Sequence, residues 1–376
     1  MKISQKHWSD KDGWADFQED AENPQLVLVF GGRKVLEHAT HYETVQAFYP
    51  DALIVLASTS GEIIDTEVHD DSLSVTAIEF EKSNIATAFT NIASQSSAEA
   101  GEALAKQLPK EGLRHLLVFS DGGLVNGTAL LEGLNSQLPD NVTITGGLAG
   151  DAADFQRTLV GLNAPPEMGN LVAIGLYGED LKIGFGSIGG WDSFGPDRII
   201  TKAEGNVLHE LDGQPALDLY KHYLGDQASE LPGAALLFPL SIRESASATE
   251  EVVRTILTID EEAKTMTFAG DLPVGNLARL MKANFDRLVD GAQRAATSGL
   301  ETIGGFEPSL ALLVSCVGRK LVLGQRVEDE VEAVRDAIGD EAAIAGFYSY
   351  GELAPSLGTI NCQLHNQTMT ITLLAE

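Results

Sequence analysis

The chain has 376 residues, of which 25 are Lys or Arg and 55 are Asp or Glu, and its formal net charge is −30 at pH 7. Such a field repels nucleic-acid phosphates and anionic lipid head groups, which argues against a role on a genome or at a membrane surface. Apolar residues make up 44% of the chain and are spread evenly, so the length predicts a globular protein of two domains rather than a disordered chain.

The N-terminal segment and the cysteines bear on cellular location. Residues 1–24 lack the basic start and the apolar run of a secretory signal, and no run of 18 consecutive apolar residues occurs. Cys316 and Cys362 stand in apolar, strand-like surroundings, where packing explains them better than chemistry. We therefore expect a cytoplasmic protein without membrane insertion.

Three strand, helix and strand units are predicted, and each ends in a small-residue turn with a glycine and an acid. They span residues 25–63, 115–152 and 310–353. Crossovers of this length predict parallel strand pairs, and hence an α/β fold. The acids that end the units, Glu62, Asp151 and Glu352, are expected at equivalent strand ends, where open sheets tend to bind ligands.

The other elements predict two domains with mixed sheets and antiparallel hairpins. In chain order they are a strand over 72–80, a helix over 85–108, hairpin strands over 171–178, 181–190 and 198–211, a helix over 215–224, strands over 235–242 and 252–260, a helix over 276–296 and a strand over 367–376. The polar, Gly/Pro-punctuated stretch 225–233 predicts a domain boundary. The chain is thus divided into a polar N-terminal extension (1–24), a first domain (25–225) and a second domain (226–376).

The turns that end the three units are the first candidates for ligand binding. Glycine lets a strand end turn sharply and approach a ligand closely. Hydroxyls beside a carboxylate, as in the first turn, suit a ligand with both ammonium and carboxylate groups, such as a free amino acid. The alternative is that the glycines only turn the chain while the acids cap N–H groups. The candidates are Ser58, Thr59, Ser60, Gly61, Glu62, Gly146, Gly147, Asp151, Tyr348, Tyr350, Gly351 and Glu352.

Further candidates lie outside these turns. Trp191, within a Gly-rich segment, offers an aromatic wall to a ligand or covers a hairpin. His365 and Asn366 precede the last strand, in what reads as a hydrogen-bonded turn. His222 stands in an amphipathic, aromatic-rich stretch and could supply an axial imidazole to haem, with His209 as second choice; a structural histidine is the alternative.

Templates for catalysis and nucleotide binding are mostly absent. The sequence contains no GxxxxGK[ST], GxGxxG with its ribose-binding acid, GxSxG, HExxH or CxxC pattern. His38 and His41 form an HxxH pair that would suit a metal only if other ligands joined them. A hydrolase-like enzyme that uses Ser60 or the Gly-acid turns is the alternative to a binding protein, although no base is identifiable near Ser60.

Several motifs in this order resemble the FIST sensory proteins, from about Leu26 to the C-terminus. They are STSGEI (58–63), GGLAGD (146–151), GGWDSFGP (189–196), HELDGQPALDLYKHYLG (209–225), GFYSYGELAP (346–355) and LHNQTMTI (364–371). The resemblance implies that the first domain is FIST N-like and the second is FIST C-like. The segments that match family motifs are 58–62, 146–151, 348–352 and 365–368.

What the resemblance implies is ligand sensing in bacterial signal transduction rather than turnover of a substrate. Two ligand classes stay open, because the family is associated with amino acids and some members bind haem and sense nitric oxide. No HAMP-like helix, GGDEF motif or kinase signature occurs in the sequence. The signal is therefore expected to pass to a partner such as a sensor histidine kinase or a cyclic-di-GMP enzyme.

Overall fold

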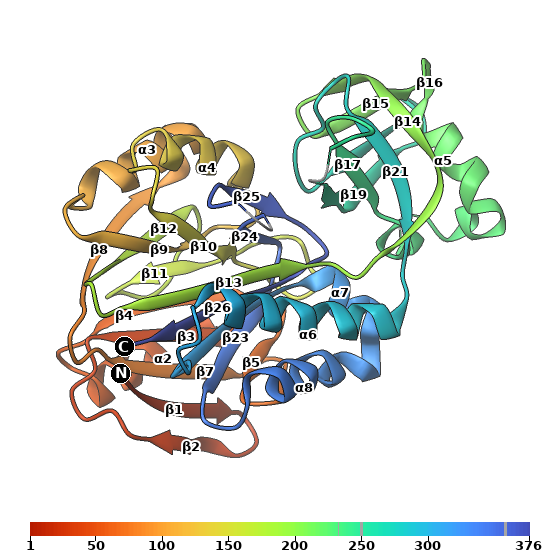
Figure 1. Cartoon of the computed structure of the whole chain (residues 1–376). Helices are drawn as coiled ribbons and strands as arrows, with labels where there is room; N and C mark the ends of the chain where they lie inside the picture. The colour runs from red at the N-terminus through yellow and green to blue at the C-terminus, as the bar shows by residue number, and fades with distance from the viewer. Residues whose placement is uncertain (232, 249–250, 357–358) are drawn as a thin grey trace.

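The computed structural model describes residues 1–231, 233–248, 251–356 and 359–376. Within them the chain builds a large part with three six-stranded sheets, called the body (1–191 and 283–376). Residues 192–282 build a smaller part around an eight-stranded sheet, called the module, which Figure 1 shows beside the body. The predicted α/β class with mixed sheets is confirmed.

Each sheet of the body takes its strands from distant parts of the chain. Sheet I is ordered β11 (Val160–Leu162), β4 (Leu53–Thr59), β3 (Leu26–Gly32), β7 (Leu73–Glu79), β1 (Lys2–Ser9) and β2 (Gly13–Glu19). Sheet II is ordered β25 (Cys362–His365), β24 (Gly351–Pro355), β10 (Thr143–Leu148), β9 (Leu113–Ser120), β12 (Asn170–Tyr177) and β8 (Asn84–Asn91). Sheet III is ordered β13 (Lys182–Ile188), β26 (Met369–Ala375), β22 (Leu310–Cys316), β23 (Ala343–Ser349), β5 (Glu62–Ile64) and β6 (Glu67–His69).

The module sheet and the helices complete the architecture. The module sheet is ordered β18 (Val252–Arg254), β17 (Leu240–Arg243), β21 (Leu277–Lys282), β14 (Asp192–Glu204), β15 (Val207–Leu211), β20 (Thr265–Phe268) and β19 (Ile256–Asp260), with β16 (Gln214–Pro215) beside β15. The α-helices are α1 (Arg33–Leu36), α2 (Ala39–Phe48), α3 (Ser97–Gln107), α4 (Gly127–Asn135), α5 (Ala216–Leu224), α6 (Phe285–Thr302), α7 (Val317–Leu323) and α8 (Val327–Ile338).

The three predicted strand, helix and strand units are present, one in each sheet. The pairs β3/β4, β9/β10 and β22/β23 are parallel and are bridged by α2, α4 and α8. Side chains along a strand point alternately to the two faces of the sheet, so each sheet has an inner face and a face toward its helices. In β3, Leu28 and Phe30 face the centre of the body, whereas Val27 and Val29 face the helix side.

The inner faces of the three sheets share one hydrophobic core. Each sheet contributes one phenylalanine to its centre, and the ring centroids of Phe30 and Phe347 lie 4.7 Å apart. Phe119 lies 5.6 Å from Phe30 and 6.1 Å from Phe347. Helices cover the outer faces: α2 on sheet I, α3 and α4 on sheet II, and α6 and α8 on sheet III (Figure 1). The body is therefore a three-sided prism around a single core.

Each unit sends its next strand into a neighbouring sheet, in a cyclic order. After β4 of sheet I the chain enters sheet III as β5, after β23 of sheet III it enters sheet II as β24, and after β10 of sheet II it enters sheet I as β11. A ring of three equivalent backbone hydrogen bonds marks these exchanges: Ser60 N to Tyr348 O at 2.8 Å, Tyr350 N to Leu148 O at 3.1 Å, and Gly150 N to Ser58 O at 2.8 Å.

The second acid is not equivalent to the other two, which corrects our expectation. Glu62 and Glu352 lie in exchanged strands, and each occupies the equivalent position in the pairing with the strand of the neighbouring sheet. Val160 takes that position in β11, because residues 151–158 form an additional loop before the strand. Asp151 begins this loop and accepts two backbone N–H groups within it.

Glu62 and Glu352 are fully buried and hold matching turns. One carboxylate oxygen of Glu62 accepts the N–H of Ser72 at 3.1 Å and its hydroxyl at 2.7 Å. One oxygen of Glu352 likewise accepts the N–H of Thr368 at 3.2 Å and its hydroxyl at 3.0 Å. The other oxygen of each acid accepts a hydroxyl three residues earlier in the chain. Burial raises the pKa of Glu62 to about 7 and that of Glu352 to about 8, against the lowering effect of these donors.

The two halves of the chain share sheets. Strands β5, β6 and β13 from the first half join sheet III, and β24 and β25 from the second half join sheet II. Residues 225–230 form a 3₁₀ turn inside the module, so the expected border near 225 does not separate body from module. Residues 1–24, expected as a polar extension, contain β1 and β2 at the edge of sheet I.

Two helix predictions were too long. Residues 84–91 form strand β8, and α3 begins only after Ser96, whose side chain forms a capping box with Glu99. Residues 277–282 form strand β21, and α6 begins after Asn284, whose side chain accepts the N–H of Arg287. In both cases the cap residue marks the true start, and the preceding apolar residues pair with strands distant in sequence.

Two strand predictions also need correction. The strands at 171–178 and 181–190 do not form a hairpin, because β12 joins sheet II while β13 joins sheet III. The hairpin over 198–211 is confirmed as β14 and β15. Residues 233–237 form a 3₁₀ turn, and the strand predicted over 235–242 begins only at Leu240, after Pro239.

A substitution at Gly146 tests how closely the strands pack in sheet II. Its φ is +141°, and an added Cβ would lie 2.0 Å from the carbonyl oxygen of Val118. We expect Gly146→Ala to lower the free energy of unfolding by roughly 3 kcal/mol, measured by chemical denaturation. Gly112→Ala is the matched control, because Gly112 also has a positive φ (+74°) but no atom within 4 Å of an added Cβ, and should cost about 1 kcal/mol. Equal losses would contradict the packing argument.

The raised pKa values of Glu62 and Glu352 predict a pH dependence of stability. The folded state holds these protons more tightly than the unfolded state, so the contribution is complete below the usual pKa of 4.5 and is lost as pH rises to about 7 and 8. Unfolding measured from about pH 5 to pH 8 should show stability falling by about 3 kcal/mol for each group. Glu62→Gln and Glu352→Gln should each remove part of this loss of stability. If the slope of stability against pH is unchanged in both variants, the prediction is wrong.

Candidate functional site

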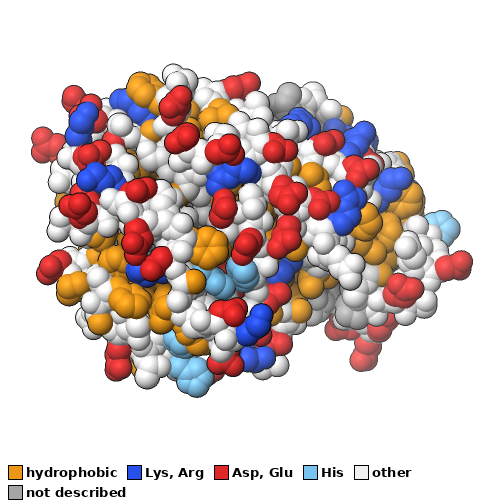
Figure 2. Space-filling model, turned by 90° about the horizontal axis from the view of Figure 1, so that it is seen from below, with side chains coloured by type: hydrophobic (Ala, Val, Ile, Leu, Met, Phe, Trp, Pro, Cys, Tyr) orange, Lys and Arg blue, Asp and Glu red, His pale blue; other side chains and the backbone are white. Residues whose placement is uncertain are grey.

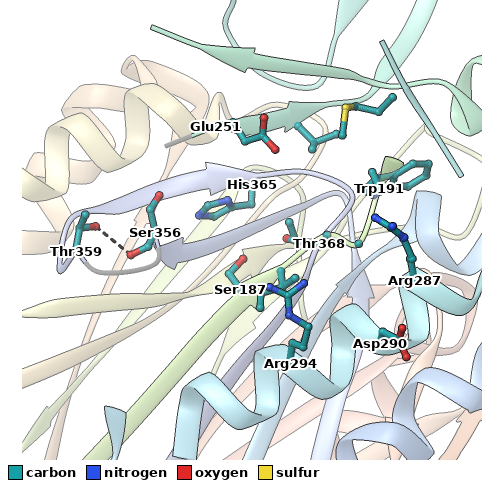
Figure 3. Close-up of a pocket in the computed structure, with 15 residues that line it drawn as sticks. Ser187, Trp191, Glu251, Arg287, Asp290, Arg294, Ser356, Thr359, His365 and Thr368 are labelled. Atoms are coloured by element: carbon teal, nitrogen blue, oxygen red, sulfur yellow. Dashed lines mark hydrogen bonds between the residues drawn. The ribbon is translucent and has the colours of Figure 1, made fainter. Parts of the chain in front are cut away.

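A cavity of about 980 Å³ lies between the body and the module. Its body side is formed by the end of β13, by α6 and by the β24–β25 hairpin, and its module side by β18 and β21 (Figure 3). The residues that line it include Ser187, Ile188, Trp191, Glu251, Val253, Met281, Arg287, Asp290, Arg294, Ser356, Thr359, His365 and Thr368. A site at a border between two parts of a protein is a common place for a small ligand.

Charged side chains line this cavity from both parts. Arg287, Asp290 and Arg294 lie on α6, where spacings of three and four residues place them on one face. Glu251 of the module lies on the opposite side, and Figure 3 shows its carboxylate across the cavity from the two arginines. In the described residues, neither Arg294 nor Asp290 takes part in an ion pair, whereas Arg287 is paired with Asp192 at 2.8 Å.

Two arginines at one cavity are a local departure from the charge of the whole chain. The formal net charge is −30, and acidic side chains are spread over the face of the molecule in Figure 2. Guanidinium groups bind carboxylates in paired hydrogen bonds, which makes them a natural binding group for an anionic part of a ligand. Glu251 accepts a hydrogen bond from the hydroxyl of Ser241 at 2.8 Å through one of its two carboxylate oxygens.

His365, at the end of β25, and Thr368 belong to the wall of the cavity on the side of the β24–β25 hairpin. His365 is 6% exposed, and its Nε2 lies 3.1 Å from the carbonyl oxygen of Ala354. Burial lowers the pKa of His365 to about 4, so its imidazole is neutral at physiological pH. Thr368 donates its hydroxyl to Glu352, which links this wall to the buried acid of the strand exchange.

A fully buried arginine supports the floor of the cavity. The guanidinium of Arg319 is paired with Glu330 at 2.6 Å, and both side chains are 0% exposed. Arg319 also donates to the carbonyl oxygen of Gly189, where the chain leaves the body, and to that of Leu288 in α6 at 2.8 Å. It therefore fixes the two segments that carry the arginines and Trp191.

A second cavity, of about 630 Å³, lies on the other side of the β24–β25 hairpin. It is lined by α4, by β25 and by the module, and Glu251 belongs to both cavities. Polar contacts cross the border here: Arg254 donates to the carbonyl oxygen of Leu364 at 2.9 Å, and Asn126 donates to Asp271 at 3.1 Å. This cavity is smaller and already bridged by protein contacts, so it is the weaker candidate.

The structure brings only two of the sequence-predicted site residues, Trp191 and His365, to the larger cavity. The others line neither of the two cavities: Ser58, Thr59, Ser60, Gly61, Glu62, Gly146, Gly147, Asp151, Tyr348, Tyr350, Gly351, Glu352 and Asn366. Their polar contacts are mostly internal, as the turn-fixing alternative expects. Ligand binding by these residues stays a prediction.

Ser60 has no catalytic partner in the part of the chain that the structure describes. Its side chain is 2% exposed and its hydroxyl donates to the carbonyl oxygen of Ala152 at 3.0 Å. Lys320 contacts the backbone carbonyl of Ser60 at 2.8 Å rather than its hydroxyl. The geometry of a nucleophile beside its base is therefore not formed around Ser60 by these contacts.

The metal and haem candidates are placed away from the cavities. His38 and His41 lie with ring centroids 6.4 Å apart, and no group of three or more metal-ligating side chains occurs among the described residues. His222 on α5 is exposed and His209 on β15 is half-buried, and neither lines either of the two cavities described above. Haem needs an apolar pocket around its axial ligand, so the residues around His222 do not fit it. None of the described helices is long and apolar enough to cross a membrane.

Sequence reasoning missed Glu251, Met281, Arg287, Asp290 and Arg294. The spacing of the two arginines and Asp290 is a local signal, but the helix predicted from 276 also includes the residues of β21. Asn284 as a helix cap sets the start at Phe285 and leaves a helix with these charges on one face. No local sequence pattern indicates that Glu251 and Met281 of the module lie at this cavity.

A curated protein and a solved structure are distantly similar to this chain. The uncharacterized protein MJ1623 of Methanocaldococcus jannaschii is 24% identical over 220 residues, which is 54% of this chain and 41% of that protein. The chain thus spans about two fifths of the length of this relative. The crystal structure of cyanuric acid hydrolase from A. caulinodans is 10% identical with a TM-score of 0.18, covering 78% of this chain and 99% of that one. A TM-score this low supports no inference.

Family comparison gives a more extensive match. The family model of the FIST N domain matches residues 25–214, and that of the FIST C domain matches residues 216–355. These are the two domains that the sequence motifs indicated, in the same order. Because the matches cover well over half of the chain, the protein belongs to the FIST family, whose domains serve small-molecule sensing in signal transduction.

Proposed function

We propose that the protein senses a small zwitterionic ligand, such as a free amino acid, in the cavity between body and module. The observation that supports this most is the placement of opposite charges on the two sides: Arg294 on the body and Glu251 on the module (Figure 3). A guanidinium pairs with the α-carboxylate of an amino acid, and a carboxylate pairs with its ammonium group. Both groups are needed, because a zwitterion carries one charge of each sign and each is paired by a group of the opposite sign.

A ligand bound by both the body and the module restricts the movement of one part relative to the other. The chain passes between body and module at two short segments, 189–191 and 283–284. A ligand that contacts Arg294 and Glu251 together favours the arrangement in which both reach it, which is the differential binding that a sensor needs. We propose that a cytoplasmic partner, a sensor histidine kinase or a cyclic-di-GMP enzyme, reads this arrangement; the family membership supports this class of partner.

Thermal unfolding with each common amino acid tests the proposal. At least one should raise the melting temperature, since a ligand at a hundred times its Kd adds about 2.7 kcal/mol of stability. Arg294→Ala should weaken this ligand by about tenfold or more, because a charged hydrogen-bonded contact is lost. Arg114→Ala, an exposed arginine on β9 that lines neither cavity, should leave the effect unchanged. The proposal fails if no amino acid stabilises the protein, or if both variants respond alike.

Haem sensing is the second prediction of the sequence, and an absorption spectrum tests it. Because His222 is exposed and lines no described cavity, we expect protein purified with adequate haem supply to show no Soret band that depends on His222. His222→Ala should give the same spectrum as the parent protein. A Soret band that is present in the parent and lost in this variant would instead establish haem with His222 as its ligand.

A further inference from the structure

One wall of the larger cavity is apolar across the border between body and module. Ile188 and Trp191 come from the body side, and Val253 and Met281 from the module. Trp191, Val253 and Met281 are at most 9% exposed and pack with residues of α6 and α7 in one hydrophobic cluster. The wall is therefore the face of a packed core rather than a set of scattered side chains.

Trp191 presents carbon atoms rather than its N–H group to the cavity. Its Nε1 donates to the carbonyl oxygen of Gln367 at 2.8 Å, which fixes the indole ring. The threonine hydroxyls of the cavity are also used within the protein, since Thr368 donates to Glu352 and Thr359 donates to the carbonyl of Ser356 at 3.2 Å. A polar ligand side chain placed against Ile188, Trp191, Val253 and Met281 would thus lose water and gain no hydrogen bond from the indole N–H.

We propose that the cavity selects an amino acid with a large apolar side chain, such as leucine, methionine or phenylalanine. This rests on the proposed function: Arg294 binds the carboxylate, Glu251 binds the ammonium group, and the side chain packs on Trp191 and Met281. A volume of about 980 Å³ leaves room for a large side chain beside these groups. Each methylene that the wall buries strengthens binding by about fourfold.

Calorimetric titration with two sets of amino acids measures this selectivity. Leucine, methionine and phenylalanine should bind at least about tenfold more tightly than glycine, serine and aspartate. Leucine methyl ester and N-acetylleucine, which each lack one of the two charges, should bind more weakly than leucine. This pattern assigns the charged groups and the apolar wall separately.

Two substitutions in the apolar wall test whether the wall causes the preference for large apolar amino acids. Met281→Gln keeps the side-chain size but adds a polar end, and Ile188→Ser acts at a half-buried position that is less needed for folding. Each should lower the preference for leucine over glycine by several-fold, with glycine affinity unchanged. Leu321→Ser is the matched control, because Leu321 is 44% exposed and lines neither cavity. Circular dichroism checks that each variant is folded.

The outcomes separate this inference from the proposed function. If glycine, serine or aspartate binds as tightly as leucine, the selectivity is overturned while amino-acid sensing stands. If leucine is preferred but neither Met281→Gln nor Ile188→Ser changes the preference, the wall is not its cause and the inference is overturned. If no amino acid binds at all, the proposed function and this inference fail together.

Discussion

The cyclic exchange of strands between the three sheets is the constraint on which the rest of the structure depends. Each sheet receives a strand from the preceding unit, and a ring of backbone hydrogen bonds closes the cycle at Ser60, Tyr350 and Gly150. A unit that folded alone would leave the edge of its sheet unpaired and its inner face exposed. The three units therefore depend on one another for both hydrogen bonds and burial, and the two family domains cannot be separated into independent halves of the body.

The cavity forms where the chain leaves the body for the module and returns to it. The module leaves the body after β13 and returns at α6, and both elements belong to the sheet III side of the prism. The buried pair of Arg319 and Glu330 lies at this junction and binds backbone carbonyls on both of these segments. A buried ion pair contributes little net stability after the cost of desolvation. The pair mainly positions the backbone, because a guanidinium with several fixed acceptors holds the floor of the cavity in one arrangement.

The repeats and most of their elements could be predicted from the sequence, because their signals are local. The continuous apolar run of β3 and the helical spacing of α8 depend only on which residues follow one another. Pairing between distant segments has no such signal. Leu277 and Leu280 are three residues apart and suited a helix, but they lie in β21, which pairs with β14 and β17. The candidate site has the same limit, since Glu251 and Arg294 meet only when module and body do.

Similar motifs serve different purposes in the repeated units, which explains why motif matching alone located little of the site. His69 and His365 each begin a four-residue turn whose final Ser72 or Thr368 donates two hydrogen bonds to a buried acid. Of these two turns, the second lines the larger cavity, because the module packs beside it, and the first lines neither of the two cavities. The Gly-acid turns and their partner turns are thus first a device for joining sheets. The turn at His365 also lines the larger cavity, where the module lies next to it.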